Sequence, residues 1–260
     1  MIPLDVLDAF SLPHNVVPLP GGQGNSWRAG DAVLKPHESS YEWISHMVNQ
    51  LHPQEFRISH HHATKDGHYT YRGWWCTHFE PGEEVTGRIS EKYHIARELH
   101  DLFRNIEKPD GWHPSESPWS QAHEIVWWER ELPKNIHPEI YEVIQGVIKL
   151  LQPLSLPNQI IHGDLCGNIL FHETLAPVVI DFSLDYRPRE YAEAILIADS
   201  IAWENGGKEA YSLLPPDSKQ VLLRACLFRL LTKALLKPED LENFRARWKG
   251  YVDIIQQITN

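Results

Sequence analysis

The stretch IIHGDLCGNILFHETLAPVVIDFS, residues 160–183, constrains the fold more than any other part of the chain. Asp164, Asn168 and Asp181 stand out in it, each set against short runs of apolar residues. Burying a carboxylate beside such runs is unfavourable unless the charge is paired or holds a cation. The stretch therefore predicts polar side chains that buried strands hold in place and that bind a cation.

The apolar runs in this stretch have the length and composition of strands. NQIIHGD, NILF and APVVIDFS predict three strands, and the loop between the first two carries Asp164 and Asn168. The third strand can bring Asp181 beside Asn168. A carboxylate and an amide oxygen together suit Mg²⁺, which usually also binds waters and substrate phosphates. Asp164 is then free to orient a hydroxyl group and accept its proton, as phosphoryl transfer requires.

Strand patterns dominate the first eighty residues, and helical patterns dominate the rest. Strands are predicted on both sides of a glycine cluster, a helix over 39–51, and a hairpin over 56–79 that turns at Asp66–Gly67. Pro81–Gly82 breaks this pattern. We therefore predict an α+β fold with a strand-rich lobe, 1–80, and a mainly helical lobe, 81–260. The helices expected in the second lobe cover residues 89–106, 137–154, 189–207, 218–236 and 238–258.

The composition, with 42% hydrophobic and 23% charged residues, is typical of a soluble globular protein. A formal net charge of −11 argues against nucleic acid or an anionic membrane as the main partner, and is compatible with a cationic substrate. No apolar run approaches the roughly 20 residues of a membrane helix. Cys76, Cys166 and Cys226 are widely separated and no signal-peptide pattern is present, so we expect reduced thiols and a cytoplasmic location.

HGDLCGNILF followed by VVIDFS resembles the aminoglycoside phosphotransferase and choline kinase-like family, which are small-molecule relatives of protein kinases. The most similar branch consists of bacterial proteins with the same short HGDLxGN loop. The resemblance implies a two-lobed protein-kinase-like fold and phosphoryl transfer from ATP with Mg²⁺. It implies that Asp164 is the catalytic base, that Asn168 and Asp181 are metal ligands, and that His162 is a structural histidine that braces the loop.

The resemblance extends more weakly to the first lobe. LPGGQGNSW corresponds to the glycine-rich loop over the phosphates, and Lys35 to the strand lysine that holds the α- and β-phosphates. Glu42 is the expected ion-pair partner of Lys35, with Glu38 as the alternative. Backbone groups around His78 are expected to read adenine. The nucleotide-binding residues so implied are Gly21, Gly22, Gly24, Ser26, Lys35, Glu42, Thr77, His78 and Phe79.

Two departures from the family pattern bear on function. Asn168 follows Asp164 by four residues, whereas the protein-kinase catalytic loop has five. The aspartate of the family's GDPxxDLA segment has no counterpart in YRPREYAEA. The first departure favours a catalytically silent module, and the second indicates that the acceptor site differs from that of the antibiotic-resistance enzymes.

Together these features predict an ATP- and Mg²⁺-dependent phosphotransferase that acts on a hydroxyl group of a small molecule. A sugar, an aminoglycoside, an amino alcohol and a modified peptide all remain open as acceptors, and the oligomeric state is open too. The alternatives are a silent kinase-like module that binds a nucleotide or a peptide, and a nucleotidyl transferase on the same fold.

Two further features favour structural interpretations over functional ones. His60, His61 and His62 are interpreted as part of a solvated hairpin, since a third metal ligand is not evident nearby. Arg187 and Arg189 follow the strand that ends at Asp181, and anchoring of the loop is preferred over a phosphate contact.

Overall fold

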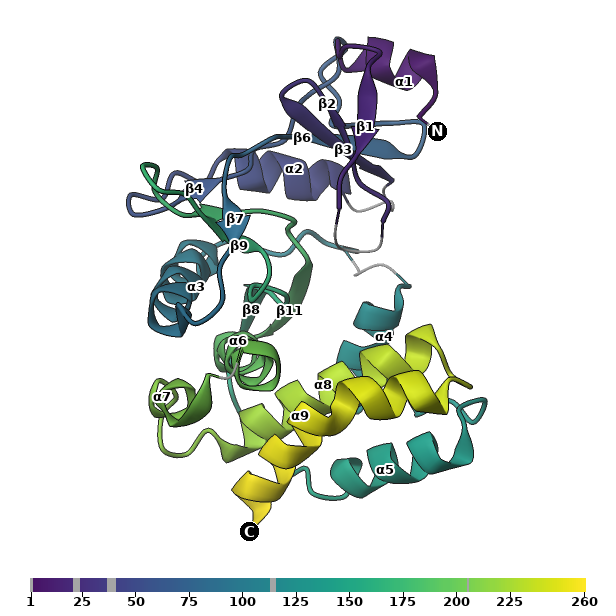
Figure 1. The fold of residues 1–260 in the computed structure, drawn as a ribbon, viewed down its shortest axis with the longest axis vertical. Coiled ribbons are helices and arrows are strands. Elements are labelled where there is room, and N and C mark those ends of the chain that lie inside the picture. Colours follow the sequence, from purple (N-terminus) through teal and green to yellow (C-terminus); the bar gives the residue numbers. More distant parts are fainter. Residues whose placement is uncertain (1, 21–23, 37–40, 113–115, 205) are drawn as a thin grey trace. The chain divides into compact units, whose positions relative to one another are not determined.

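The computed structural model describes the 260-residue chain except for Met1, 21–23, 37–40, 113–115 and 205. The chain has a mixed α+β structure that divides into two compact units (Figure 1). Unit 1 comprises Met1–Glu84, Gly111–Ser115 and Asn168–Asp181. Unit 2 comprises Val85–Asp110, Glu116–Gly167 and Phe182–Asn260. The predicted α+β class, with strands concentrated toward the N-terminus and helices toward the C-terminus, is confirmed.

Two sheets form the framework of unit 1. The first has the strand order β1-β2-β3-β6-β5 and is antiparallel throughout. Its strands are β1 (Val16–Pro18), β2 (Trp27–Ala29), β3 (Ala32–Pro36), β6 (Trp74–His78) and β5 (Thr70–Tyr71). The second has the order β4-β10-β9-β7, formed by Arg57–Ile58, Val178–Val179, Ile169–Phe171 and Glu83–Glu84. Helices α1 (Leu4–Ala9) and α2 (Tyr41–Asn49) complete the unit.

The alternation of side chains along β3 positions the lysine of the predicted site. Ala32 and Leu34 are buried and share a core cluster with residues of α1, such as Val6 and Leu7. Because successive side chains of a strand point to opposite faces, Lys35 lies on the face opposite this core.

Helices build most of unit 2. They are α3 (Ile89–Phe103), α4 (Pro118–Val126), α5 (Pro138–Ile148), α6 (Arg189–Glu204), α7 (Gly207–Ser212), α8 (Lys219–Leu236) and α9 (Leu241–Thr259). Strand β8 (Asn158–His162) pairs antiparallel with β11 (Leu184–Pro188). Helix α8 is buried along most of its length and packs against α4, α5, α6 and α9. Among the described residues, we find no helix with the length and apolar character needed to cross a membrane.

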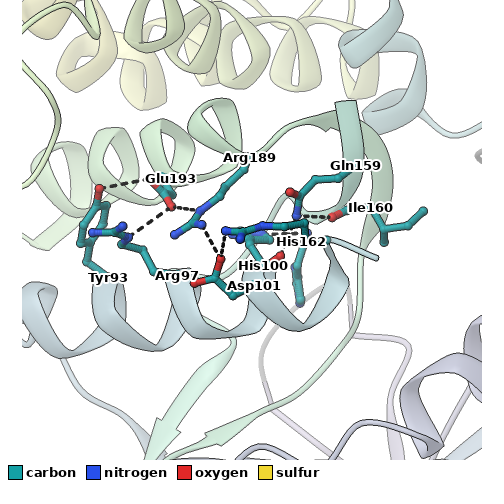
Figure 2. Close-up of polar contacts among 10 residues, drawn as sticks. Tyr93, Arg97, His100, Asp101, Gln159, Ile160, His162, Arg189 and Glu193 are labelled. Carbon is teal, nitrogen blue, oxygen red and sulfur yellow. Dashed lines mark hydrogen bonds and ion pairs between the residues drawn. The ribbon is translucent and has the colours of Figure 1, made fainter. Parts of the chain in front are cut away.

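A polar layer connects α3 to α6 and β8 within unit 2 (Figure 2). Arg189 donates hydrogen bonds to Glu193 at 2.6 Å and to Asp101 of α3 at 2.7 Å. The His162 N–H, at the end of β8, donates to Nε2 of His100 on α3 at 3.2 Å. Arg189 is thus a structural anchor, and α3 fixes the strand that leads into the HGD segment.

The hairpin predicted to turn at Asp66–Gly67 turns elsewhere. Strands β5 and β6 are joined at Arg72–Gly73, where both residues have positive φ angles of 48° and 80°. Such angles at both central positions suit a tight two-residue hairpin. The Gly67 N–H instead closes a local turn with the Thr64 carbonyl at 2.9 Å. The Asp-Gly pair is the stronger statistical signal, but the pairing of the strands selected Arg-Gly.

The two units differ from the expected lobes in where residues 168–181 belong. The first boundary falls between Glu84 and Val85, near the predicted break at Pro81–Gly82. Residues 168–181, which we had placed in the second lobe, belong to unit 1 because β9 and β10 pair with β7 and β4. Helices α1, α4 and α7 and strands β7 and β11 were not predicted, although Ser117 and Pro118 form a recognisable start for α4.

The solvated-hairpin interpretation is wrong for His61. This residue is only 4% exposed, and its main-chain N–H donates to the Asn49 side-chain oxygen at 2.7 Å. Burial, together with the neighbouring His60, lowers the pKa of His61 to about 3. The fully buried His100 also has its pKa lowered to about 3, by burial first and by nearby positive groups second.

We predict that acidification destabilises the protein in part through His61 and His100. The unfolded histidines bind protons below a pH of about 6.5, whereas the folded ones stay neutral until about pH 3. Each should therefore remove about 1.4 kcal/mol of unfolding free energy per pH unit as the pH falls through this window. Urea unfolding between pH 7 and 4 measures the slope. His61→Gln should reduce it by that amount, and the exposed His52→Gln should not.

Candidate functional site

Lys35 and Asp181 form the centre of the candidate site in unit 1. The Lys35 ammonium lies 2.7 Å from a carboxylate oxygen of Asp181, and their side chains are 21% and 40% exposed. Asp181 adopts a positive φ of 55°, a conformation that costs a non-glycine residue about 1–2 kcal/mol. Backbone strain of this kind concentrates at functional sites, where the surrounding structure maintains it. The ion pair therefore holds a strained aspartate in a fixed and partly exposed position.

The pairing of β9 and β10 holds Asn168 next to the segment that ends at Asp181. The Asn168 carbonyl accepts a hydrogen bond at 3.0 Å from the N–H of Ile180, the residue before Asp181. A turn at Cys166–Gly167 leads directly into Asn168, so the short loop still reaches the start of β9. A carboxylate and an amide oxygen on neighbouring chain segments fit the oxygen ligands that Mg²⁺ prefers.

Glu42 does not pair with Lys35 as we expected. Its carboxylate accepts hydrogen bonds from the Tyr69 N–H at 3.0 and 3.1 Å and from the Thr70 hydroxyl at 3.2 Å. Helix α2 therefore uses this acid to hold the start of β5 and the residue before it, and Asp181 is the carboxylate on Lys35. The alternative partner, Glu38, lies outside the described residues.

The predicted glycine-rich loop lies between β1 and β2. The Leu19 N–H donates to the Ser26 carbonyl at 2.9 Å, which closes the base of the loop. Gly24 has a φ of 71°, in the left-handed region that favours glycine, and a Cβ there would meet nothing within 4 Å. Gly21 and Gly22 lie outside the described residues. The described part thus forms a strand–loop–strand with open space at Gly24.

The backbone at Thr77, His78 and Phe79 is already engaged in hydrogen bonds and strand pairing. Thr77 pairs with Val33 in the sheet. The His78 N–H donates to the His60 carbonyl at 2.9 Å, and the Phe79 N–H to the carbonyl of the turn at residue 31 at 2.7 Å. The N–H groups at 78 and 79 are therefore already bonded within unit 1, and the reading of adenine by backbone groups of this segment stays a prediction.

Asp164 lies in unit 2, in the loop that follows β8. Its N–H donates to Nδ1 of the buried His162 at 3.2 Å, and the Gly163 N–H donates to the Ser183 carbonyl at 3.0 Å. These bonds fix the loop from both sides. His162 thus braces the loop, as the family resemblance implied.

One arginine that the sequence analysis missed organises the surroundings of Asp164. Arg229 of α8 donates from Nη2 to the Asp164 carboxylate at 2.6 Å, and its Nε donates to Asp199 at 2.9 Å. Asp199 also accepts from the Tyr251 hydroxyl at 2.8 Å, which in turn accepts from Trp203 Nε1 at 2.7 Å. The signal was available, because Arg229 interrupts an apolar run in which a lone cation needs partners.

The shared guanidinium affects the two carboxyl groups differently. Burial raises the pKa of Asp164, but the charge and hydrogen bond of Arg229, together with the nearby His162 and Lys233, lower it by more, so that the pKa lies below its usual value. Burial raises the pKa of Asp199 and outweighs the effect of Arg229 there. Asp164, whose side chain is 41% exposed, is therefore a carboxylate at neutral pH and able to accept a proton.

Arg187 is occupied by carboxylates and is not free to bind a phosphate. Its two terminal nitrogens donate to the two carboxylate oxygens of Glu129, each at 2.6 Å, and Asp185 lies 3.2 Å from its Nε. The preferred interpretation of this residue as an anchor therefore agrees with its contacts.

We predict that Arg229→Met lowers the unfolding free energy by about 3–5 kcal/mol, because it leaves the buried Asp199 carboxylate without its cation. Arg245→Met is the matched control, since it removes an arginine from an exposed ion pair with Glu139 and should cost about 0–1 kcal/mol. Urea denaturation of both variants measures the difference. Equal small losses would show that Arg229 is not the central counter-ion.

No family model and no curated protein sequence matches the chain. Several solved structures match it nearly end to end. The choline kinase LicA of Streptococcus pneumoniae is 11% identical, with a TM-score of 0.62 and 97% of each chain covered. The amicoumacin kinase hAmiN, solved with AMP-PNP, Ca²⁺ and Ami, is 14% identical, with a TM-score of 0.65 over 98% of this chain and 92% of that one.

The spectinomycin phosphotransferase APH(9)-Ia, solved with ADP and spectinomycin, is 13% identical, with a TM-score of 0.59 over 97% of this chain and 92% of that chain. The predicted protein-kinase-like fold of the choline kinases and aminoglycoside phosphotransferases is thereby confirmed. At these identities the likeness establishes the fold alone. It does not establish the activity, which depends on the residues of this chain.

Proposed function

We propose that this chain is an ATP- and Mg²⁺-dependent phosphotransferase that acts on a hydroxyl group of a small molecule. The observation that carries the proposal is the contact between Lys35 and the strained Asp181, with Asn168 directly before the neighbouring strand β9. A cation for phosphate oxygens and two oxygen ligands for a metal are what a nucleotide-binding half-site needs. The shared fold with small-molecule kinases supports this assignment.

Lys35, Asn168 and Asp181 are the proposed nucleotide- and metal-binding residues. The Lys35 ammonium binds phosphate oxygens of the nucleotide, and the Asn168 and Asp181 oxygens hold Mg²⁺. When bound, Mg²⁺ neutralises negative charge on the phosphates. The left-handed backbone at Asp181 and its ion pair orient the carboxylate before any ligand arrives.

Asp164 is the proposed general base. Arg229 keeps it ionised and His162 holds its backbone, so the carboxylate can accept the proton of the acceptor hydroxyl as the oxygen attacks the terminal phosphate. Such assistance is typically worth about 10²–10⁴-fold in rate.

We also propose that the protein works in the cytoplasm. ATP is the proposed donor there, and the three buried free cysteines of the protein stay reduced.

We predict that ATP with Mg²⁺ stabilises the protein and that Asp181 and Asp164 contribute differently. Saturating ligand at about 100 times its Kd adds about 2.7 kcal/mol, which raises Tm by several degrees. Asp181→Asn should reduce this shift, whereas Asp164→Asn should preserve it and lower turnover about 10²–10⁴-fold. Thermal melts and calorimetry measure binding. The absence of a shift with any nucleoside triphosphate would exclude an ATP site.

We predict that Lys35→Met strongly weakens ATP binding, because it removes the cation that binds the phosphates. Glu42→Gln provides a comparison within the same unit, since Glu42 bonds the 69–70 segment and does not contact Lys35. It should lower the unfolding free energy by about 1 kcal/mol and leave the ATP affinity within about twofold. Calorimetric titration with ATP and Mg²⁺ distinguishes the two. A larger effect of Glu42→Gln on affinity would restore Glu42 as a site residue.

The acceptor is identified by incubating the protein with a metabolite extract, ATP and Mg²⁺, and by searching for compounds that gain a phosphate by mass spectrometry. Asp164→Asn is the matched inactive control in this screen. A compound that gains phosphate only with the unaltered protein is an acceptor.

A further inference from the structure

Two basic side chains, one on α8 and one on α9, have no carboxylate partner among the residues that the structure describes. Lys233 lies on α8 one turn after Arg229, so the two share a face of the helix. Arg247 lies on α9, which packs against α8. Neither Lys233 nor Arg247 forms an ion pair or a side-chain hydrogen bond with any residue that the structure describes. Lys233 is half-buried, so solvent compensates its charge only in part.

Some other cations of α8 and α9 are paired with carboxylates. Lys237, at the end of α8, lies 3.7 Å from Asp240. Lys249, on α9, lies 2.8 Å from Asp253. The chain as a whole has an excess of acidic residues, with 35 Asp and Glu against 24 Lys and Arg.

Lys219 and Arg224 of α8 also lack a carboxylate within the part of the chain that the structure describes, but Lys219 is exposed and Arg224 donates to Gln220 and to the Gln152 carbonyl. Lys233 differs from both, because it is half-buried and has neither kind of partner among the described residues.

The charges around Lys233 come from both helices and from α6. Burial lowers the pKa of Lys233, and the positive charges of Arg229 and Arg247 lower it further, against the opposing effect of Asp199 and Asp164. Like charges held together are unfavourable unless a counter-ion joins them. Such uncompensated groups gather at binding sites more often than elsewhere.

One nitrogen of the Arg229 guanidinium, Nη1, forms no hydrogen bond with the described residues. Its Nε and Nη2 are bonded to Asp199 and Asp164, whereas Nη1 has no acceptor within the described part of the chain and is not sealed from solvent. A guanidinium whose orientation is fixed by two carboxylates presents its remaining N–H groups in a set direction. An anionic group placed there would form a charge-assisted hydrogen bond.

We propose that Arg229 Nη1, Lys233 and Arg247 form a cationic subsite that binds a carboxylate or phosphate group of the acceptor. This proposal rests on the proposed function, in which the acceptor hydroxyl is bound at Asp164. The acceptor class is then a hydroxy acid or a phosphorylated polyol. The same cations disfavour a positively charged acceptor such as a quaternary ammonium alcohol.

Anion binding is tested first, without reference to catalysis, on the full chain labelled with ¹³C at lysine Cε. Titration with inorganic phosphate and, separately, with acetate should raise the pKa of Lys233, since a bound anion favours the ammonium form. The Lys233→Met variant assigns the resonance. Lys237, already paired with Asp240, is the control and should not respond. The probe that acts at the lower concentration distinguishes phosphate from carboxylate, and no response of Lys233 to either overturns the subsite.

The acceptor class is tested second, with the compounds that gain phosphate in the metabolite screen. Lys233→Met should raise KM for an anionic acceptor about 10–100-fold, with kcat and the KM for ATP within about threefold. Lys237→Met should change neither KM.

Urea denaturation should show Lys233→Met at least as stable as the unaltered protein, because an unpaired cation has been removed. Acceptors that are neutral or cationic would overturn the proposal. If the metabolite screen yields no phosphorylated compound while the pKa of Lys233 still responds to phosphate in the NMR titration, the proposed kinase activity is rejected and the anion subsite stands.

Discussion

The sharing of one guanidinium between two carboxylates organises the helical part of this protein. Arg229 projects from α8, a helix buried along most of its length, and its charge would be costly there without Asp164 and Asp199. Asp199 is held in turn by Tyr251, so α6, α8 and α9 converge on one polar centre inside an apolar core. The same centre keeps Asp164 ionised. Packing and acid–base chemistry are therefore coupled at this point.

A second cation–carboxylate contact organises unit 1 in a simpler way. Lys35 comes from β3 and Asp181 follows β10, so the pair joins segments that are 146 positions apart in the chain. Its partly exposed position and the left-handed backbone at Asp181 distinguish it from an ordinary surface ion pair. In the proposed function, this internal contact is exchanged for nucleotide phosphates and a metal at low reorganisation cost.

The contacts that differ from those expected at the site have a common cause. Glu42 was assigned to Lys35 by helix register and family pattern, but its carboxylate binds the start of β5 and the residue before it. His78 and Phe79 were expected to offer backbone groups, but their N–H groups are used within unit 1. In each case the residue lies near its expected position in the sequence, and a partner from a distant segment decides what it contacts. Such partners are set by strand pairing and packing, which local patterns do not encode.

The amino-acid sequence alone determined the α+β class, the order of the longer helices and of the strands around the HGD segment, and the identity of the polar positions in HGDLCGN and VVIDFS. These follow from hydrophobic periodicity and from chemically unusual residues in apolar runs, which are local properties. Only the tertiary structure decided that Lys35 contacts Asp181, that residues 168–181 join unit 1, and that Arg229 reaches Asp164 from α8. Each of these depends on long-range packing, because a buried charge takes whichever opposite charge the fold brings within reach.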